Sequence, residues 1–457
     1  MTDFASLSLQ PALLKAVQTL GYTRMTPVQA ASLPPMLEGR DVIAQAMTGS
    51  GKTAAFGLAL LSKLDASAVS TQALVLCPTR ELADQVSKEI RRLASGIPNV
   101  KVLTLCGGIP LGPQVASLSH PPHVVVGTPG RIQDLLAKKA LALRPLKVFV
   151  LDEADRMLDM GFEEDINAIV KQVPKQRQTL LFSATWPEPI RALGARLQRD
   201  PVAVTIETAQ AAPAIEQHFF EVDTPRKVDA LTLLLATHKP ESALVFCNTR
   251  RDVDDVADQL RQRGHAALAL HGDMEQRDRD EVLLRFANRS CGVLVATDVA
   301  ARGLDIKELP AVVSFELATD ADAHVHRIGR TGRAGNSGLA LALVAPREVT
   351  RVATIEAALG LQARWGRVDL SQRVPKPAPP AMATLAIDGG RQDKLRPGDI
   401  VGALTGEAGL KADAIGKIDT FATRSYVAVA REQAALALER LRAGKIKGRN
   451  FRVRRVE

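Results

Sequence analysis

Short runs of apolar residues alternate with amphipathic stretches over the first two thirds of the chain, and this alternation restricts its fold more than any other feature. The runs are rich in Val and Leu and end in small or polar residues, as in ALVLCPT (73–79), VFVLDEAD (148–155) and SALVFCNT (242–249). A continuous apolar run indicates a strand buried on both faces, and its alternation with helices indicates a parallel α/β sheet. Ligands of such sheets bind at the carboxyl ends of the strands, so we expect the functional side chains there.

Two segments of different composition divide the chain. ETAQAAPAIEQ (207–217) is rich in small and polar residues, and RVPKPAPPAMA (373–383) contains four prolines, which favour an extended spacer. The patterns around these segments predict two α/β domains in tandem, followed by a small α+β module. The expected boundaries are a first domain at 1–206, a linker at 207–215, a second domain at 216–370, a Pro-rich linker at 371–383 and the module at 384–457.

The positive charge of the chain is unevenly distributed. The net charge is +9, and residues 384–457 hold fifteen Lys or Arg against nine Asp or Glu, so two thirds of the excess lies in the last sixth of the chain. A basic excess favours a polyanionic partner. The alternative interpretation of the C-terminal charges is a solvated basic edge that only keeps an edge strand from aggregating.

The four cysteines, at positions 77, 106, 247 and 291, are far apart and form no CxxC pair. This spacing predicts buried free thiols in a reducing compartment. The N-terminal sequence MTDFASLSLQ has no basic region followed by an apolar core, and no apolar run approaches the ~18 residues of a membrane span. We therefore expect a cytoplasmic protein.

A phosphate-binding loop is predicted at AMTGSGKT (46–53), which follows the apolar run DVIAQ. Glycines let backbone N–H groups surround phosphates, while the Lys side chain reaches the terminal phosphates and the Thr hydroxyl coordinates Mg²⁺. Ala46 stands where the usual pattern begins with Gly, but the tight part of the pattern is kept. A glycine turn without a ligand is the alternative, and the length of the pattern argues against it. The predicted nucleotide-binding residues are Thr48, Gly49, Ser50, Gly51, Lys52 and Thr53.

Asp152 and Glu153 end the apolar run VFVL. One carboxylate, Asp152, can hold Mg²⁺ through water, and the next can orient or deprotonate the attacking water. An acidic turn or helix cap is the alternative interpretation of the pair taken alone. Beside a phosphate-binding loop, the pair predicts hydrolysis of a nucleoside triphosphate.

The tetrad DEAD at 152–155, together with the phosphate-binding loop, resembles the DEAD-box RNA helicases. The other motifs of that family occur in order: GYTRMTPVQ (21–29), PTREL (78–82), GG (107–108), TPGR (128–131), SAT (183–185), VFCNT (245–249), QRDR (276–279), ATDVAARGLD (296–305) and HRIGRTGR (326–333). The resemblance covers nearly all of residues 1–370. It implies two RecA-like parallel-sheet domains, ATP and Mg²⁺ as cofactors, and RNA rather than DNA as the partner.

The resemblance also implies how ATP is held and cleaved. Thr26 and Gln29 belong to the adenine-recognition motif, Phe4 stacks on the adenine ring, and Asp305 contacts the ribose. In this motif, Met25 stands where the family often has Pro. The implied catalytic set is Lys52, Asp152, Glu153, Arg330 and Arg333, in which the two arginines approach the phosphates from the second domain.

The same resemblance implies residues that couple ATP hydrolysis to RNA. Ser183 and Thr185 contact the acidic tetrad and link hydrolysis to RNA binding. Most RNA contacts go to phosphate and sugar, which position the strand without reading its sequence. The implied RNA-binding residues are Arg80, Gly108, Thr128 and Arg131 in the first domain, and Thr249, Arg250, Gln276, Arg279 and Thr297 in the second.

The C-terminal module resembles an RRM in the order of its strands and helix. RSYVAVA (424–430) stands at the position of the RRM's aromatic motif, but Ala428 and Ala430 occupy the places of stacking aromatics. We therefore expect charge and loop contacts to dominate RNA binding, with strong salt dependence. The candidate residues are Lys445, Lys447, Arg449, Arg452 and Arg454.

The whole chain is similar to a bacterial subfamily of DEAD-box helicases that act in ribosome assembly. That similarity implies a target for the module, a hairpin of 23S ribosomal RNA near the peptidyl-transferase centre, bound during large-subunit assembly. The expected activity is local, non-processive unwinding of RNA duplexes. The alternatives are a general RNA helicase and an ATP-gated RNA clamp, each with a nonspecific basic anchor.

Overall fold

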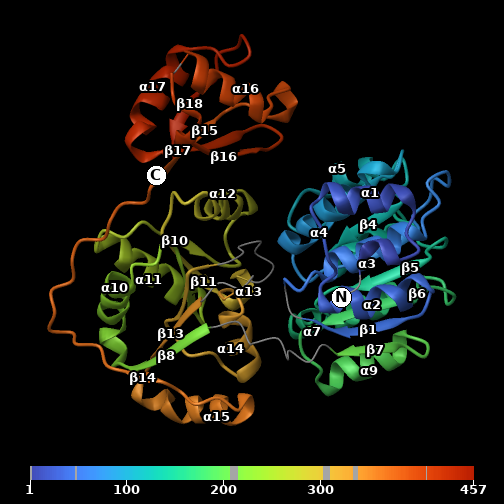
Figure 1. Cartoon of the computed structure of the whole chain (residues 1–457), viewed down its shortest axis with the longest axis horizontal. Helices are drawn as coiled ribbons and strands as arrows, with labels where there is room; N and C mark the ends of the chain where they lie inside the picture. Colours follow the sequence, from blue (N-terminus) through green and yellow to red (C-terminus); the bar gives the residue numbers. More distant parts are fainter. Residues whose placement is uncertain are drawn as a thin grey trace. The chain divides into compact units, whose positions relative to one another are not determined.

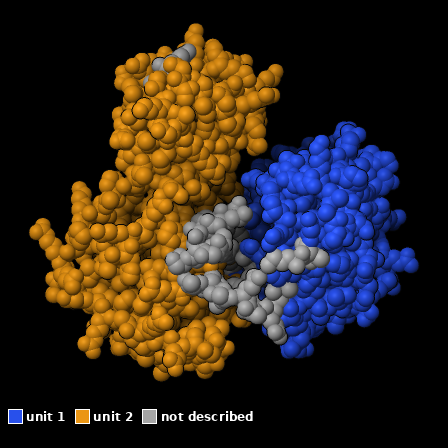
Figure 2. Space-filling view, in the orientation of Figure 1, with its two compact units in different colours: residues 1–211, 302–305 blue, residues 212–301, 306–457 orange. Residues whose placement is uncertain are grey.

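The computed structural model describes residues 3–46, 49–205, 215–301, 309–332, 338–407 and 409–456. The chain forms two compact units, whose described parts are residues 3–205 and 215–456 (Figure 2). Phe4–Ser6 form a short 3-10 helix before the first α-helix. In the described residues, no helix combines the length and the apolar character that crossing a bilayer requires.

The first unit is a parallel sheet covered by helices on both faces (Figure 1). Its strands follow the spatial order β3-β4-β2-β5-β6-β1-β7, and their bounds are β1 Val42–Gln45, β2 Ala73–Leu76, β3 Val102–Leu105, β4 Val124–Gly127, β5 Val148–Leu151, β6 Gln178–Ser183 and β7 Val202–Thr205. The helices are α1 Pro11–Thr19, α2 Pro27–Leu37, α3 Lys52–Ser62, α4 Arg80–Leu93, α5 Leu111–Ser117, α6 Pro129–Ala137, α7 Ala154–Asp159, α8 Glu163–Val170 and α9 Glu188–Leu197.

Strand residues of the first unit alternate between two apolar cores. Val75 and Val150 pack with helices α1 to α4 on one face, while Leu74 and Phe149 pack with helices α6 to α9 on the other. Burial on both faces explains why these strands appear in the sequence as continuous apolar runs.

The second unit contains another parallel sheet with the strand order β10-β11-β9-β12-β13-β8-β14. Its strands are β8 Ile215–Glu221, β9 Ala243–Cys247, β10 Ala267–Leu270, β11 Val293–Thr297, β12 Ala311–Ser314, β13 Gly338–Val344 and β14 Trp365–Gly366. The helices are α10 Lys227–His238, α11 Arg250–Gln262, α12 Gln276–Ala287, α13 Asp298–Ala301, α14 Ala321–Ile328 and α15 Val349–Leu359. Strand β8 begins at the last residue of the expected linker 207–215, whose other residues lie outside the described part of the chain.

The end of the second unit is a small antiparallel sheet with the order β16-β17-β15-β18. Its elements are β15 Met382–Ile387, α16 Pro397–Gly402, β16 Ile415–Thr420, β17 Ser425–Ala430, α17 Ala434–Ala443 and β18 Val453–Arg455. Strand β15 starts inside the segment expected as the Pro-rich linker. Helices α16 and α17 cover one face of the sheet around a core that includes Leu385, Val427 and Leu441.

The predicted fold class, two RecA-like parallel-sheet domains followed by a small α+β module, is therefore confirmed. The four cysteines are buried and free, as expected. Burial raises the pKa of each thiol, so these sulfurs are poor nucleophiles at neutral pH.

Candidate active site and RNA-binding surfaces

The phosphate-binding loop joins β1 to α3 at the carboxyl edge of the first sheet. Gly49 and Gly51 have φ values of 88° and 91°, a left-handed conformation that costs glycine little. Gly51 immediately precedes α3, and Lys52 is the first residue of that helix. Ser50 Oγ is buried and has no hydrogen-bond partner in the part of the chain that the structure describes. Thr48 lies outside the described residues.

Lys52 lies against the acidic residues that follow β5. Its Nζ is 2.8 Å from Asp152 Oδ1 and 3.7 Å from Glu153 Oε1, and all three side chains are buried. Burial alone would lower the pKa of Lys52, but the negative charges of Asp152 and Glu153 outweigh it and raise the pKa. Burial also raises the pKa of Asp152, which shares its surroundings with other carboxylates. The ammonium group therefore stays charged, as phosphate binding requires.

Asp152 is suited to a hydrated metal ion. Apart from the Lys52 ion pair, neither of its carboxylate oxygens has a hydrogen-bond donor among the described residues. Unsatisfied buried oxygens of this kind are costly, and the water shell of Mg²⁺ would satisfy them. Thr53, the second residue of α3, is partly buried and supplies the hydroxyl expected for the metal. The chemistry of these residues fits Mg²⁺ bound with a nucleotide.

Glu153 has a strained backbone. Its φ and ψ are 55° and 56°, the left-handed region that non-glycine residues avoid. It directly precedes α7, between Asp152 at the end of β5 and the rest of the acidic tetrad. Such strain costs about 1–3 kcal/mol and is concentrated at functional sites. The Glu153 carboxylate lies near Lys52, and its role as the catalytic base stays a prediction.

Among the predicted adenine-recognition residues, Gln29 is hydrogen-bonded to the phosphate-binding loop. The Gln29 side-chain amide donates from Nε2 to the Gly51 carbonyl at 3.0 Å, and its Oε1 accepts from Thr26 N at 2.9 Å. A Cβ on Gly51 would come 2.6 Å from Gln29 Nε2, so this contact needs glycine. The Phe4 ring is 2% exposed and stacks with Tyr22 at 6.5 Å between ring centroids. The stacking of adenine on Phe4 stays a prediction.

Asp155 joins the acidic tetrad to the SAT motif. Its Oδ2 accepts hydrogen bonds from Ala184 N, Thr185 N and Thr185 Oγ1, each at 3.1 Å. Ser183 Oγ donates to the Thr185 carbonyl at 2.7 Å. Ser183 and Thr185 were predicted as coupling residues, whereas Asp155, the last residue of the tetrad, was not.

The predicted RNA-binding residues of the first unit gather around the loop after β3. The Arg80 guanidinium lies over Gly108, where a Cβ would come within 2.2 Å of it. Thr128 Oγ1 accepts from Gly107 N at 3.3 Å, and Arg131 Nη2 donates to the carbonyl of Ile109 at 3.0 Å. These side chains follow β2, β3 and β4, whose carboxyl ends are adjacent.

The predicted RNA-binding residues of the second unit also lie at adjacent strand ends. Thr249 follows β9, Thr297 ends β11, and Arg250 forms an ion pair with Asp273 in the loop after β10. Arg279 donates to the carbonyl of His271 in the same loop at 3.3 Å. Gln276 begins α12, and its amide donates to Asp280.

The arginines of HRIGRTGR lie in different environments. Arg327, which the sequence analysis did not select, is 1% exposed and forms an ion pair with Asp298 at 2.7 Å. It also donates to Asn248 Oδ1 at 2.7 Å, so it holds the ends of neighbouring strands together. Arg330 is buried, two residues after α14 ends. Arg333 and Asp305 lie outside the described residues, so their predicted roles are not described by the structure.

The basic residues of the C-terminal domain are divided between two places. Lys445, Lys447 and Arg449 surround a tight turn in which Lys447 and Gly448 have φ values of 53° and 75°. Arg452 is exposed just before β18. Arg454 instead lies 3.5 Å from Glu281 of α12, so it faces the preceding α/β domain.

The sheet face on which an RRM stacks bases is covered by α12. Tyr426, the aromatic residue of β17, is 5% exposed, and its hydroxyl donates to Glu281 Oε2 at 3.1 Å. Leu284 of α12 packs with Tyr426, Ala386 and Val456 on this face. Base stacking on this face is therefore limited for two reasons. Alanines of β17 replace the stacking aromatic residues, and α12 already covers the face.

Comparisons with known proteins match three successive segments of the chain. Residues 26–193 match the family DEAD/DEAH box helicase, residues 226–335 match the helicase conserved C-terminal domain, and residues 384–455 match the DbpA RNA binding domain. A solved structure of Dbp5 from S. cerevisiae bound to RNA and ADP BeF3 superposes with a TM-score of 0.75 and 30% identity, covering 81% of this chain and 96% of that one.

The chain belongs to the DEAD-box family and is an ATP-dependent RNA helicase. Over 455 residues it is 55% identical to the ATP-dependent RNA helicase DbpA of Escherichia coli (strain K12), an alignment that covers 99% of both chains. It is also 47% identical over 357 residues to the DEAD-box ATP-dependent RNA helicase CshA of Bacillus cereus, which covers 78% of this chain and 68% of that protein. The similarity to DbpA thus extends through the C-terminal domain.

Proposed function

We propose that the chain couples ATP hydrolysis to local, non-processive separation of RNA strands, and that its C-terminal domain directs this activity to a hairpin of 23S ribosomal RNA near the peptidyl-transferase centre. The observation that carries the first part is the buried group of Lys52, Asp152 and Glu153, joined to the SAT motif through Asp155. The full-length similarity to DbpA supports the second part.

Each residue of the ATP site has a defined task in this proposal. Lys52 holds the terminal phosphates, Thr53 and Asp152 hold Mg²⁺, and Glu153 orients and deprotonates the attacking water. Bound Mg²⁺ would neutralise charge on the phosphates. Ser183 and Thr185 transmit the state of this site through Asp155, whose three hydrogen bonds are rearranged if the SAT segment moves. Gln29 and Thr26 make the site selective for adenine.

In this proposal, the C-terminal domain determines which RNA the helicase acts on. With its sheet face against α12, the domain binds RNA through the turn around Lys447 and the exposed residues that follow it. Because the domain is tethered to the α/β domain, the helicase core is held beside the bound hairpin. The high effective concentration of nearby RNA then makes sequence recognition by the core unnecessary. A target of this kind belongs to assembly of the large ribosomal subunit and to the cytoplasm.

The rate of ATP hydrolysis with different RNAs tests this proposal. Full-length protein is mixed with 23S rRNA, with a fragment carrying the hairpin, and with an unrelated structured RNA at equal nucleotide concentration. Selective stimulation by the first two is expected. Deletion of residues 384–457 should leave stimulation by generic RNA and remove the selectivity. Equal stimulation by all three RNAs would reject the proposed targeting to the 23S rRNA hairpin. The protein would then be a general RNA helicase with a nonspecific basic anchor.

A release assay with a labelled duplex separates helicase from clamp. ATP-dependent strand release in parallel with hydrolysis is expected for a helicase. Hydrolysis with RNA retention and no strand release would indicate an ATP-gated clamp. Lys52→Ala is the control for both assays, because it removes the ammonium group that faces the phosphates.

A further inference from the structure

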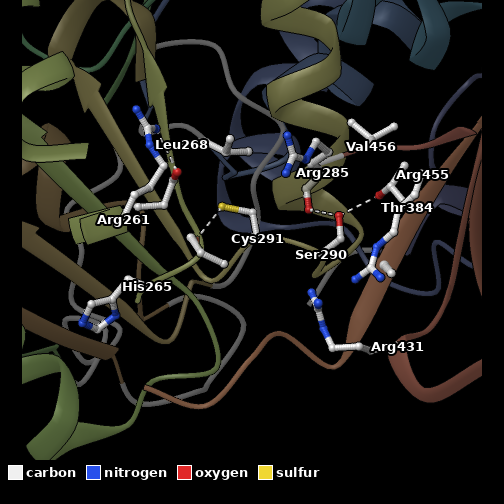
Figure 3. A pocket seen from close by; sticks show the side chains of 13 residues that line it. Arg261, His265, Leu268, Arg285, Ser290, Cys291, Thr384, Arg431, Arg455 and Val456 are labelled. Atoms are coloured by element: carbon white, nitrogen blue, oxygen red, sulfur yellow. Dashed lines mark hydrogen bonds between the residues drawn. The ribbon is translucent and has the colours of Figure 1, made fainter. Parts of the chain in front are cut away.

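A cavity of about 620 Å³ lies where the second α/β domain meets the C-terminal domain (Figure 3). One wall comes from α11, the start of β10 and the end of α12, and includes Arg261, His265 and Arg285. The other wall comes from β15, the start of the segment leading to α17, and β18, and includes Arg431 and Arg455. Its volume falls within the range of ligand pockets, about 300–1,000 Å³.

The cavity is strongly positive. Four arginines line it, and none of its thirteen lining residues is a carboxylate. The pKa of Arg431 is lowered by burial and by the charge of Arg455, and the pKa of Arg285 is lowered by burial. Arg261 has the Asp258 carboxylate as its partner and Arg285 lies near Glu281, so the unbalanced positive charge rests mainly on Arg431 and Arg455. Like charges raise one another's energy, and an anion between them would relieve this repulsion.

Buried hydroxyl groups fix the two walls relative to each other. Ser290 Oγ and Thr384 Oγ1 are 2.6 Å apart, and Asn288 Nδ2 donates to the same Thr384 oxygen at 2.9 Å. All three residues are buried. Arg431 is held in turn by the carbonyls of Pro380 and Met382. Arg431 is thus positioned before any ligand arrives, which lowers the entropy cost of binding one.

We propose that this cavity binds phosphate groups, and that the backbone of an RNA strand running along the joint between the two domains supplies them. Guanidinium groups bind phosphate through paired N–H donors, and two domains supply them here. The cavity is separate from the predicted RNA-binding residues of the second α/β domain, which follow the carboxyl ends of β9, β10 and β11, whereas His265 precedes β10. On its other wall it adjoins the C-terminal candidates, because Arg455 is next to Arg454. The inference rests on the proposed RNA-helicase function and adds a second RNA contact to it.

The salt dependence of RNA binding tests the site. The variant Arg261→Ala/Arg455→Ala removes two exposed cavity arginines, one from each wall. Arg251→Ala/Lys417→Ala is the matched control, because these exposed residues lie on α11 and β16, outside the cavity, and carry the same total charge. The affinity of each full-length protein for the hairpin fragment with single- and double-stranded flanks is measured by fluorescence anisotropy at several salt concentrations.

The cavity variant should bind more weakly than the control, and its slope of log affinity against log salt should be smaller by about 1.4 to 1.8, the loss expected for two phosphate contacts. Arg261→Lys/Arg455→Lys should recover part of the slope, which also shows that the fold tolerates changes at these positions. Loss of the same size in the control, or no difference between the two variants in any measurement, would overturn the site.

A titration with inorganic tripolyphosphate, followed by calorimetry, distinguishes the source of the phosphate groups. Heat that the cavity variant loses and the control keeps, with RNA binding unchanged, would assign the site to a free phosphate compound. RNA-stimulated ATP hydrolysis by the unmodified protein is measured alongside. Its absence would reject the proposed function, whereas its presence with equal slopes and equal heats would reject only the cavity.

Discussion

Lys52 Nζ lies 2.8 Å from Asp152 Oδ1 inside the first unit, and the two side chains are 4% and 0% exposed. Removing one partner leaves a buried charge without compensation, which costs about 3–5 kcal/mol. Lys52→Ala should therefore abolish ATP turnover and also lower the melting temperature of the first unit. Lys52→Ala/Asp152→Asn should recover much of that stability and none of the turnover. Equal melting of the two variants would show that the Asp152 charge costs the fold nothing once Lys52 is removed.

Glu153, the proposed catalytic base, has an unfavourable backbone conformation. Glu153→Gln should reduce ATP turnover by about 10²-fold or more, because it removes the base and keeps the shape. Glu153→Gly and Glu153→Ala should both be inactive, but the glycine variant should be about 1–2 kcal/mol more stable, since only glycine adopts a φ of 55° at little cost. Denaturant unfolding of the two variants measures this difference. An alanine variant as stable as the glycine variant would show that the backbone there is unstrained.

Asp155 provides a way to separate hydrolysis from strand separation. Thr185→Val keeps the shape of the side chain and removes one of the three hydrogen bonds that Asp155 Oδ2 accepts from the SAT motif, a loss of about 1.5–3 kcal/mol. We expect RNA-stimulated ATP hydrolysis to persist and strand release per ATP to fall. Ser117→Ala, on α5 away from this network, is the control. Parallel loss of both activities would place Thr185 in the hydrolysis step instead.

The general fold followed from the sequence because its signals are local and redundant. Most strands of the two parallel sheets are apolar runs with both faces buried, and predicted site residues such as Asp152, Ser183 and Thr249 lie at their carboxyl ends. Because parallel strands end at the same edge of a sheet, a residue's position at a strand end predicts the edge on which it lies. No knowledge of side-chain geometry is needed for this prediction. The sequence pattern of the phosphate-binding loop is long enough to predict a nucleotide-binding site by itself.

The contacts between distant residues did not follow from the sequence. The bonds from Thr185 to Asp155 and from Tyr426 to Glu281 join residues 30 and 145 positions apart. Each depends on the packing of whole elements to within an ångström, and no local pattern marks the partner. Arg327 was missed for the same reason. It lies in the same motif as Arg330, and no local pattern shows that Arg327 forms a buried ion pair with Asp298.

His324 should make the second unit sensitive to acid. Burial and the charge of Arg327 lower the pKa of His324 from 6.5 to about 4. Between these values the unfolded chain binds a proton that the folded chain does not, so stability is lost as the pH falls from about 6.5 to about 4, by roughly 3 kcal/mol. His324→Gln keeps a hydrogen-bond donor for Gln217 and should flatten this dependence. His120→Gln, at an exposed position, should leave it unchanged.

The turn of the C-terminal domain and its covered sheet face should respond differently to mutation. Lys445→Ala/Arg449→Ala removes two cations beside the turn and should weaken binding of the hairpin fragment, with a smaller salt slope. Tyr426→Phe removes only the hydroxyl group that donates a hydrogen bond to Glu281 on the sheet face covered by α12. It should therefore leave the affinity for the hairpin unchanged and lower the melting temperature of the second unit. Anisotropy and thermal melting of the full-length variants measure both effects. Strong loss of hairpin binding in Tyr426→Phe, with the turn variant unaffected, would mean that the sheet face leaves α12 to bind RNA as an ordinary RRM does.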